Sequence, residues 1–230
     1  MKNFRLLAVT AMIAIGLLLG FQPTAHALVL TLDSSLNGLG TIDATVVDAD
    51  NDGLVSYNGA VPGFAVNVTT GLSNPILGSA TAPQLDLNSI NVTSFGGTLV
   101  IALWDSGFVS NGTLVNFDLA AGGTISSGQI TIQLYGDGTN VEPGGTGNLI
   151  VGLGPFTPVA FSGTGSGSFV DADNYSLGLV ATIIMPQRVV SSVSFNASAN
   201  GTPVPIPAAG WLIGAGLLPF IRLRRKSLMA

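Results

Sequence analysis

The chain has 230 residues, with 31 glycines, 12 acidic and 7 basic residues, no cysteine and one histidine. Without cysteine there is no disulfide framework and no thiolate nucleophile, and one histidine is too few for the usual zinc or copper sites. The formal net charge of −5 disfavours binding to nucleic acid, because phosphates repel an acidic surface.

The first predicted element is a secretory signal peptide over residues 1–27. Two basic residues precede an apolar run over 6–20, and Ala25 and Ala27 form an A-x-A cleavage site. This pattern predicts a signal helix that enters the Sec translocon and is cut by signal peptidase after Ala27. The alternative, an N-terminal transmembrane helix, is disfavoured by the short run. The single histidine, His26, would leave with the peptide, which excludes Ser-His-Asp catalysis in the exported chain.

The exported chain is strongly acidic. Residues 28–201 hold all twelve acidic residues and one basic residue, Arg188, a formal charge of 1 − 12 = −11. Such a surface attracts divalent cations. An enzyme of this composition would depend on carboxylates alone, as glycosidases do, with two of them facing each other across a cleft. Because Glu142 is the only glutamate, we expect a non-enzymatic protein.

Residues 28–201 have the pattern of an all-β domain. Glycine recurs between short runs rich in Val, Ile, Leu and Thr, and no segment keeps helical periodicity over three turns. The clearest alternation is 129–135, and the most apolar run, 98–104, predicts a central strand covered on both faces. Further strands are expected over 28–33, 40–47, 54–58, 64–69, 85–92, 114–119, 175–185 and 189–197, with a strand beginning at Ser168.

About a dozen such strands predict one two-sheet antiparallel β-sandwich, either jelly-roll or immunoglobulin-like. A slip in the alternation at Ser89 predicts a β-bulge. The Ser/Gly stretch 161–167 is expected to connect strands, and residues 200–203 are expected to link the domain to the tail.

An acidic turn follows the second expected strand. Asp48, Asp50 and Asp52 alternate before Gly53, as in the first half of a calcium loop, where a hard cation binds several oxygens. The twelfth loop position is Gly59 instead of a bidentate glutamate, so the loop is incomplete. The alternative is an Asp-rich turn held by bonds to its own backbone. Calcium is the one cofactor for which the sequence offers candidate ligands.

Carbohydrate binding is a further hypothesis for this domain. Trp104 and Phe108 could form a platform for a sugar ring, although a tryptophan that ends a doubly apolar strand is typical of a core position. The alternative function is therefore a calcium-dependent, lectin-like adhesin.

The last predicted element is a membrane-anchoring tail over residues 202–230. A proline-rich hinge favours extended backbone, and an uncharged run over 206–221 follows it. A helix of that length covers about 24 Å, less than the ~30 Å hydrocarbon core, and a basic cluster would hold its end on the cytoplasmic side. The hinge comprises Val204, Pro205, Ile206 and Pro207, and the membrane-stop cluster comprises Arg222, Arg224, Arg225 and Lys226.

This tail resembles the PEP-CTERM sorting signal, in the variant whose hinge reads Val-Pro-Leu-Pro-Ala. The hinge, Trp211-Leu212, the Gly-rich run 214–218 and the basic cluster carry the resemblance, with Ile206 in place of the usual leucine. The resemblance implies sorting by an exosortase-type membrane protease in a Gram-negative bacterium that produces exopolysaccharide. The alternative is an ordinary membrane anchor.

We therefore expect an exported surface or extracellular-matrix protein. It would be anchored in the inner membrane in transit and later lie at the cell surface or outside the cell. Its expected partners are the export and sorting machinery and exopolysaccharide.

Overall fold

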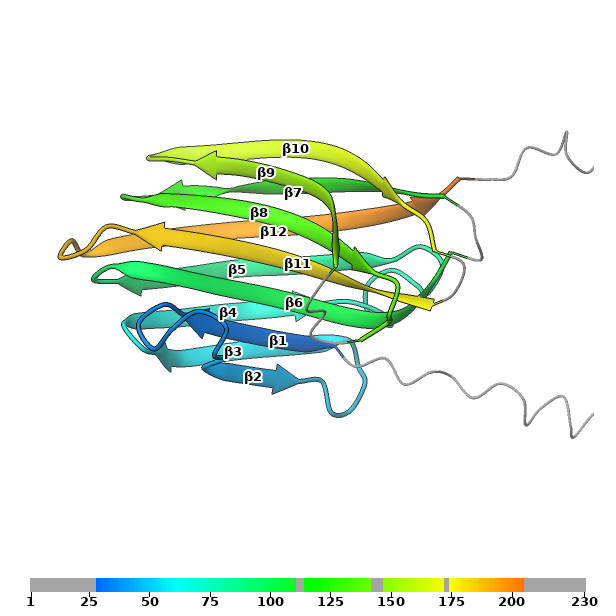
Figure 1. The fold of residues 1–230 in the computed structure, drawn as a ribbon, viewed down its shortest axis with the longest axis horizontal. Helices are drawn as coiled ribbons and strands as arrows, with labels where there is room; N and C mark the ends of the chain where they lie inside the picture. Colours follow the sequence, from blue (N-terminus) through cyan, green and yellow to red (C-terminus); the bar gives the residue numbers. More distant parts are fainter. Residues whose placement is uncertain (1–27, 111–113, 142–146, 172–173, 205–230) are drawn as a thin grey trace, which may run out of the picture.

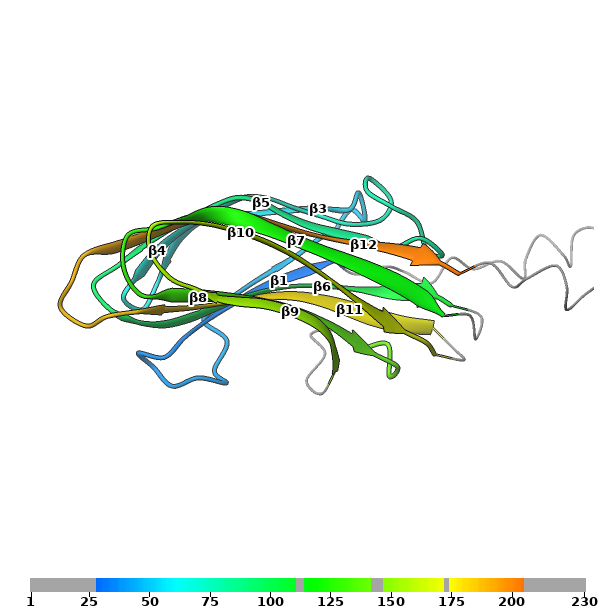
Figure 2. The same cartoon turned by 90° about the horizontal axis from the view of Figure 1, so that it is seen from above.

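The computed structural model describes residues 28–110, 114–141, 147–171 and 174–204. In these ranges twelve strands form two six-stranded antiparallel sheets that lie face to face (Figures 1 and 2), which confirms the predicted two-sheet, all-β architecture. The two predicted flanking helices lie outside the described residues. Among the described residues, no helix has the length and apolar character needed to cross a membrane.

The first sheet, sheet A, has the strand order β2-β1-β6-β11-β8-β9. Its strands are β1 (Val29–Ser34), β2 (Ala44–Val47), β6 (Gly97–Val109), β8 (Gln129–Asp137), β9 (Asn148–Phe156) and β11 (Asn174–Met185). Strand β6 lies between β1 and β11, in the central position that its apolar sequence predicts.

The second sheet, sheet B, has the strand order β10-β7-β12-β5-β4-β3. Its strands are β3 (Leu54–Val61), β4 (Phe64–Leu72), β5 (Gln84–Ser94), β7 (Val115–Ile125), β10 (Ala160–Phe169) and β12 (Ser191–Pro203). In β12, Val193 and Phe195 are buried while Ser192 and Ser194 are exposed. This alternation gives sheet B one face toward the core and one toward solvent.

The inward side chains of both sheets form one apolar core. Phe108 and Tyr175 of sheet A and Phe117 and Phe195 of sheet B are fully buried. The rings of Phe169 in sheet B and Tyr175 in sheet A lie 5.1 Å apart between centroids, so aromatic contacts join the sheets. Each large apolar side chain buried here contributes roughly 1.5–3 kcal/mol.

Strand β5 contains the β-bulge that the sequence predicts. Ser89 has a φ of 53°, and the pairing of β5 with β12 shifts opposite Asn196. The backbone N–H of Ser89 donates to Asn196 Oδ1 at 2.6 Å. The extra residue lets Leu87 and Ile90, three positions apart, both point into the core.

Residues 40–43, expected to begin a strand, precede β2, and β9 lies where no strand was expected. Two further segments also differ from the expectation. Residues 161–167, expected to connect strands, belong to β10, which pairs with β7 along its whole length. Its inward glycines make room for β9, since a Cβ on Gly163 would lie 2.8 Å from the Phe156 ring. Residues 200–203, expected as a linker, are the end of β12 and pair with β7. Hydrogen bonding along the ladders outweighs the local turn signals.

Both ends of the described chain lie at one end of the sandwich, which we call the terminal end (Figure 1). Strand β1 begins there at Val29, opposite Trp104, and β12 ends there at Pro203, opposite Val115. The backbone N–H of Val204 donates to the carbonyl of Leu114 at 2.9 Å. The folded domain therefore continues to the first residue of the predicted hinge.

Candidate functional site

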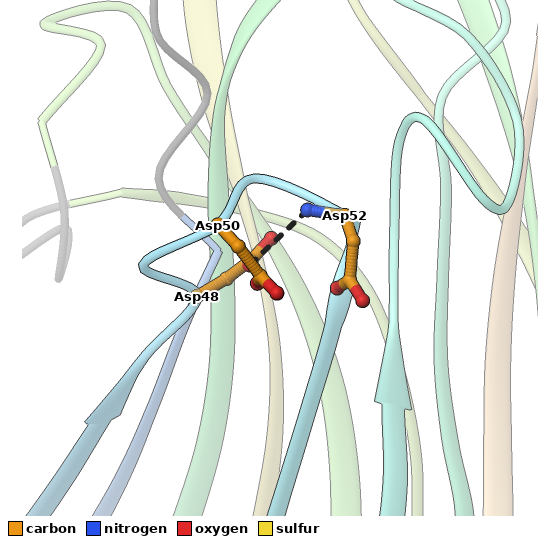
Figure 3. Close-up of side chains that lie close together, drawn as sticks. All are labelled: Asp48, Asp50 and Asp52. Carbon is orange, nitrogen blue, oxygen red and sulfur yellow. Dashed lines mark hydrogen bonds between the residues drawn. The ribbon is translucent and has the colours of Figure 1, made fainter.

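The acidic turn between β2 and β3 brings its three aspartates together (Figure 3). One carboxylate oxygen from each of Asp48, Asp50 and Asp52 lies within 4.8 Å of the other two. Asp48 is 5 % exposed, whereas Asp50 and Asp52 are exposed to solvent. The predicted cluster thus exists at the terminal end of the sandwich, with one buried and two accessible carboxylates.

Two of these aspartates also hold the turn. Asp48 accepts the backbone N–H groups of Asp52 at 3.2 Å and of Gly53 at 2.8 Å, and Asp52 accepts the N–H of Leu54 at 2.9 Å. Gly53 has a φ of 81°, and a Cβ there would lie 2.6 Å from the carbonyl oxygen of Ser73. The self-bonded Asp-rich turn, the alternative explanation of the motif, is therefore present.

Asp50 experiences the repulsion within the cluster. A side-chain hydrogen bond with Asp48 and the negative charge of Asp52 raise the pKa of Asp50 above its usual value. A divalent cation would reverse this effect, but calcium takes six to eight oxygens. The three carboxylates fit part of a calcium shell at the surface, with other oxygens needed to complete it.

The aromatic residues considered as a sugar platform are buried. Trp104 is 6 % exposed and lies against Gly178, where a Cβ would come within 2.5 Å of the indole ring. Phe108 is fully buried against Tyr175, with 5.9 Å between the ring centroids. Neither ring has a face available for stacking on a sugar.

The outer face of sheet B is a candidate surface that the sequence reading missed. Small polar side chains dominate it and align in rows across paired strands. One row continues from Thr124 of β7 through Ser194 of β12 and Asn91 of β5 to Asn67 of β4. Rows recur about every 6.6 Å along strands that lie about 4.8 Å apart, which produces a regular array of hydroxyl and amide groups.

We call the part of this array on four strands the polar face. It comprises Ser162, Thr164, Ser166 and Ser168 of β10, Asn116, Asp118 and Thr124 of β7, Ser194, Asn196, Ser198, Asn200 and Thr202 of β12, and Asp86, Asn88, Asn91 and Thr93 of β5. The sequence contained a signal for it, because the alternate residues 192–202 of β12 are all Ser, Asn or Thr.

Two open hollows lie on the polar face. The first has a volume of about 380 Å³, and its lining includes small residues of β7 together with Asp86, Thr164, Asn196 and Ser198. The second, of about 430 Å³, lies toward the terminal end and is lined by six residues that include Asp118. Each hollow holds one carboxylate, so neither supplies the acid pair of a glycosidase. Burial raises the pKa of Asp86, and its hydrogen bond with Asn88 opposes this shift.

Of the predicted cleavage, hinge and membrane-stop residues, the structure describes one, Val204. The other predicted residues lie outside the described part of the chain, namely Ala25, Ala27, Pro205, Ile206, Pro207, Arg222, Arg224, Arg225 and Lys226.

No protein-family model and no curated protein matches the chain. Among solved structures, the K1 cleaved adhesin domain of Lys-gingipain from Porphyromonas gingivalis W83 has a TM-score of 0.31 at 10 % identity, covering 66 % of this chain and 99 % of that one. The carbohydrate-binding module TmCBM61, in complex with β-1,4-galactotriose, has a TM-score of 0.29 at 9 % identity, covering 58 % and 86 %. A family 16 carbohydrate-binding module has a TM-score of 0.28 at 12 % identity, covering 59 % and 85 %. Similarities of this size do not establish a shared fold or function.

Proposed function

We propose that this chain is an exported, non-enzymatic surface or matrix protein whose polar face binds a neutral, hydroxyl-rich polysaccharide. In this proposal the tail keeps the protein in the inner membrane until an exosortase-type protease acts at the hinge. The protein then reaches the cell surface or the extracellular matrix of an exopolysaccharide-producing bacterium.

The single observation that supports the binding role is the regular array of hydroxyl and amide groups on sheet B. These groups both donate and accept hydrogen bonds, as sugar hydroxyls do. The array repeats along and across the strands, which suits a polymer with a repeating unit better than one small ligand. The acidic charge of the exported chain favours a neutral polysaccharide over an acidic one.

The sorting role is supported by the hinge sequence and by the position of Val204. Strand β12 pairs with β7 as far as Pro203, and Val204 is hydrogen-bonded to Leu114. The predicted hinge therefore starts directly at the end of the folded domain, with no intervening linker.

Binding is tested by affinity electrophoresis of the purified full chain in gels that contain dextran or the host exopolysaccharide. We expect retardation by at least one of the polymers, relative to a gel without polymer, and weaker retardation for the double variant Asp86→Ala/Ser198→Ala, which removes two polar side chains from the first hollow. Thr45→Ala, which removes an exposed hydroxyl from β2 of sheet A, away from the polar face, is the control. Unretarded migration in both polymers, or equal retardation of all three proteins, contradicts the binding role.

Sorting is tested by the intact mass of the protein in membrane and extracellular fractions of its host. We expect an extracellular species that begins at Leu28 and ends near Pro205. If every species retains Arg222–Lys226 and stays in the membrane, the tail is an ordinary anchor and the sorting role is wrong.

A calcium-dependent adhesin is the second candidate, and the three clustered carboxylates favour it. A ligand that binds only the folded state raises its stability. Calcium is then expected to raise the melting temperature of the wild-type chain more than that of Asp50→Asn, in which one carboxylate is lost. An equal response of the two proteins contradicts a calcium site in this turn.

A further inference from the structure

The four edge strands of the sandwich differ in how they resist pairing with another chain. Strand β2 has four residues, β9 has two register shifts against β8, and β3 has one against β4. Short edges and bulges are devices that discourage edge-to-edge association. Strand β10 has neither, since its ten residues pair with β7 without a register shift. It also carries no charged residue and no proline.

The free edge of β10 presents a regular set of backbone groups. The N–H of Ile125 donates to the carbonyl of Val159 at 2.8 Å, so these two residues form a hydrogen-bonded pair of the β7–β10 ladder. Such pairs recur at every second residue. The N–H and C=O groups of the even-numbered residues of β10 therefore point away from β7. Strand β10 is the last strand of sheet B (Figure 1), and among the described residues no strand is hydrogen-bonded to its second edge. Strand β9 of sheet A packs against its inward glycines.

We propose that β10 pairs with β10 of a second copy of this chain, antiparallel and centred on Thr164. In this register Thr164 lies opposite its own equivalent, Ser162 opposite Ser166, and Ala160 opposite Ser168. All of these are even-numbered residues, so every pair exchanges two backbone hydrogen bonds. The register thus uses the whole free edge and leaves no polar group of it unpaired.

Charge and side-chain size favour this partner over others. The exported chain carries a formal charge of −11 as derived above, so two copies associate best where acidic residues are absent. Strand β10 offers uncharged Ser and Thr side chains on its outer face. Pairing would join two polar faces into one continuous surface. It would also place the two Pro203 residues at opposite ends of the joint sheet. Two tails that leave in opposite directions do not enter one membrane together easily, so this arrangement suits chains whose tail has been cleaved.

Cysteine cross-linking tests the register, because the chain has no native cysteine. In a hydrogen-bonded antiparallel pair the Cα atoms lie about 5.5 Å apart, within the range of a disulfide. The full chain carrying Thr164→Cys, kept in mild detergent with oxidised glutathione, is expected to form a disulfide-linked dimer. Ser194→Cys, on the same face but two strands from the edge, is the control and should remain largely monomeric. A mixture of Ser162→Cys and Ser166→Cys chains should cross-link better than either chain alone.

Sedimentation of the wild type and of two lysine variants, in the same detergent, tests the association itself. We expect the wild type to show a concentration-dependent dimer and Thr164→Lys to weaken it at least about tenfold, because like charges would face each other across the pair. Ser194→Lys adds the same charge away from the edge and should dimerise as the wild type does. A wild-type chain that is monomeric throughout, or dimers unaffected by Thr164→Lys, would overturn the proposal. Cross-linking of Thr164→Cys no faster than the Ser194→Cys control would overturn the register.

Discussion

At the scale of single residues, close contacts decide which side chain each position accepts. Trp104 on β6 faces Gly178 on β11 across a pair of the ladder, and the indole ring occupies the space of the missing side chain. Tyr175 illustrates the opposite situation, because its ring packs well while its hydroxyl is buried and has no hydrogen-bond partner among the described residues.

Gly178→Ala should therefore be strongly destabilising. Its Cβ would lie 2.5 Å from the Trp104 ring, and overpacking of this kind typically costs about 1–3 kcal/mol. Urea denaturation of the variant measures the loss. Gly152→Ala is the control, because the nearest atom to a Cβ there is 3.5 Å away. Equal stability of the two variants would contradict the packing of Trp104.

Tyr175→Phe should stabilise the protein. A buried, unpaired hydroxyl keeps a desolvation cost of about 1–3 kcal/mol, and phenylalanine removes it without changing the shape of the ring. Burial also raises the pKa of the Tyr175 phenol, so the group stays neutral at ordinary pH. In the control, Tyr57→Phe, the lost hydroxyl donates to the carbonyl of Ala60 at 3.1 Å, and no gain is expected. A lower melting temperature for Tyr175→Phe would show that its hydroxyl has a partner.

Asp50→Asn should raise the melting temperature at neutral pH. The hydrogen bond with Asp48 and the charge of Asp52 raise the folded-state pKa of Asp50, so the folded chain holds this proton more tightly than the unfolded one. The associated stability is present below the unfolded pKa and is lost as the pH rises through the folded value. The difference between variant and wild type should therefore shrink toward about pH 3 in a calcium-free melting series. A difference that is independent of pH would contradict this origin.

At the scale of elements, the bulge in β5 keeps two apolar stretches of one strand in the same core. Without it, the side chains on one side of Ser89 would turn to the wrong face of the sheet. The side chain of Asn196 on the neighbouring strand β12 accepts a hydrogen bond from the backbone N–H of Ser89, and so ties β12 to the bulge.

Asn196→Ala should therefore reduce stability by about 1 kcal/mol, the typical net contribution of one hydrogen bond. Thermal or urea unfolding monitored by circular dichroism gives the difference. Ser194→Ala, the next outward residue of the same strand, is expected to be close to neutral. If the two substitutions have the same effect, the Asn196 side chain does not stabilise the bulge.

At the scale of the whole molecule, charge is unevenly distributed along the sandwich. The turn that contains Asp48, Asp50 and Asp52 lies at the terminal end. Asp137, the last residue of β8, lies at the same end, opposite Ser176 near the start of β11. Arg188 lies in the turn between β11 and β12, at the opposite end. Repulsion among the acidic groups opposes the compact state.

Added salt should therefore stabilise the protein. Raising the ionic strength from about 0.01 M to 0.15 M shortens the Debye length from about 30 Å to 8 Å and screens this repulsion. The melting temperature should rise with sodium chloride and level off. Asp50→Asn, which carries one acidic charge fewer, should respond less. A melting temperature that falls over this range would mean that attractive pairs dominate the electrostatics.

The sequence by itself determined the all-β class, the central position of β6 and the bulge at Ser89, because burial and alternation are properties of neighbouring residues. It also brought Asp48, Asp50 and Asp52 together, since one turn holds all three. Strand β10 and the last residues of β12 were decided by the tertiary structure, because their small residues resemble a turn until hydrogen bonds to β7 fix them. Only the pairing of strands distant in sequence aligns single Ser, Thr and Asn residues into a polar face. The pairing of β6 with β11, which are distant in sequence, places the ring of Trp104 over Gly178, so the residue that the local sequence offered as a candidate sugar platform is buried.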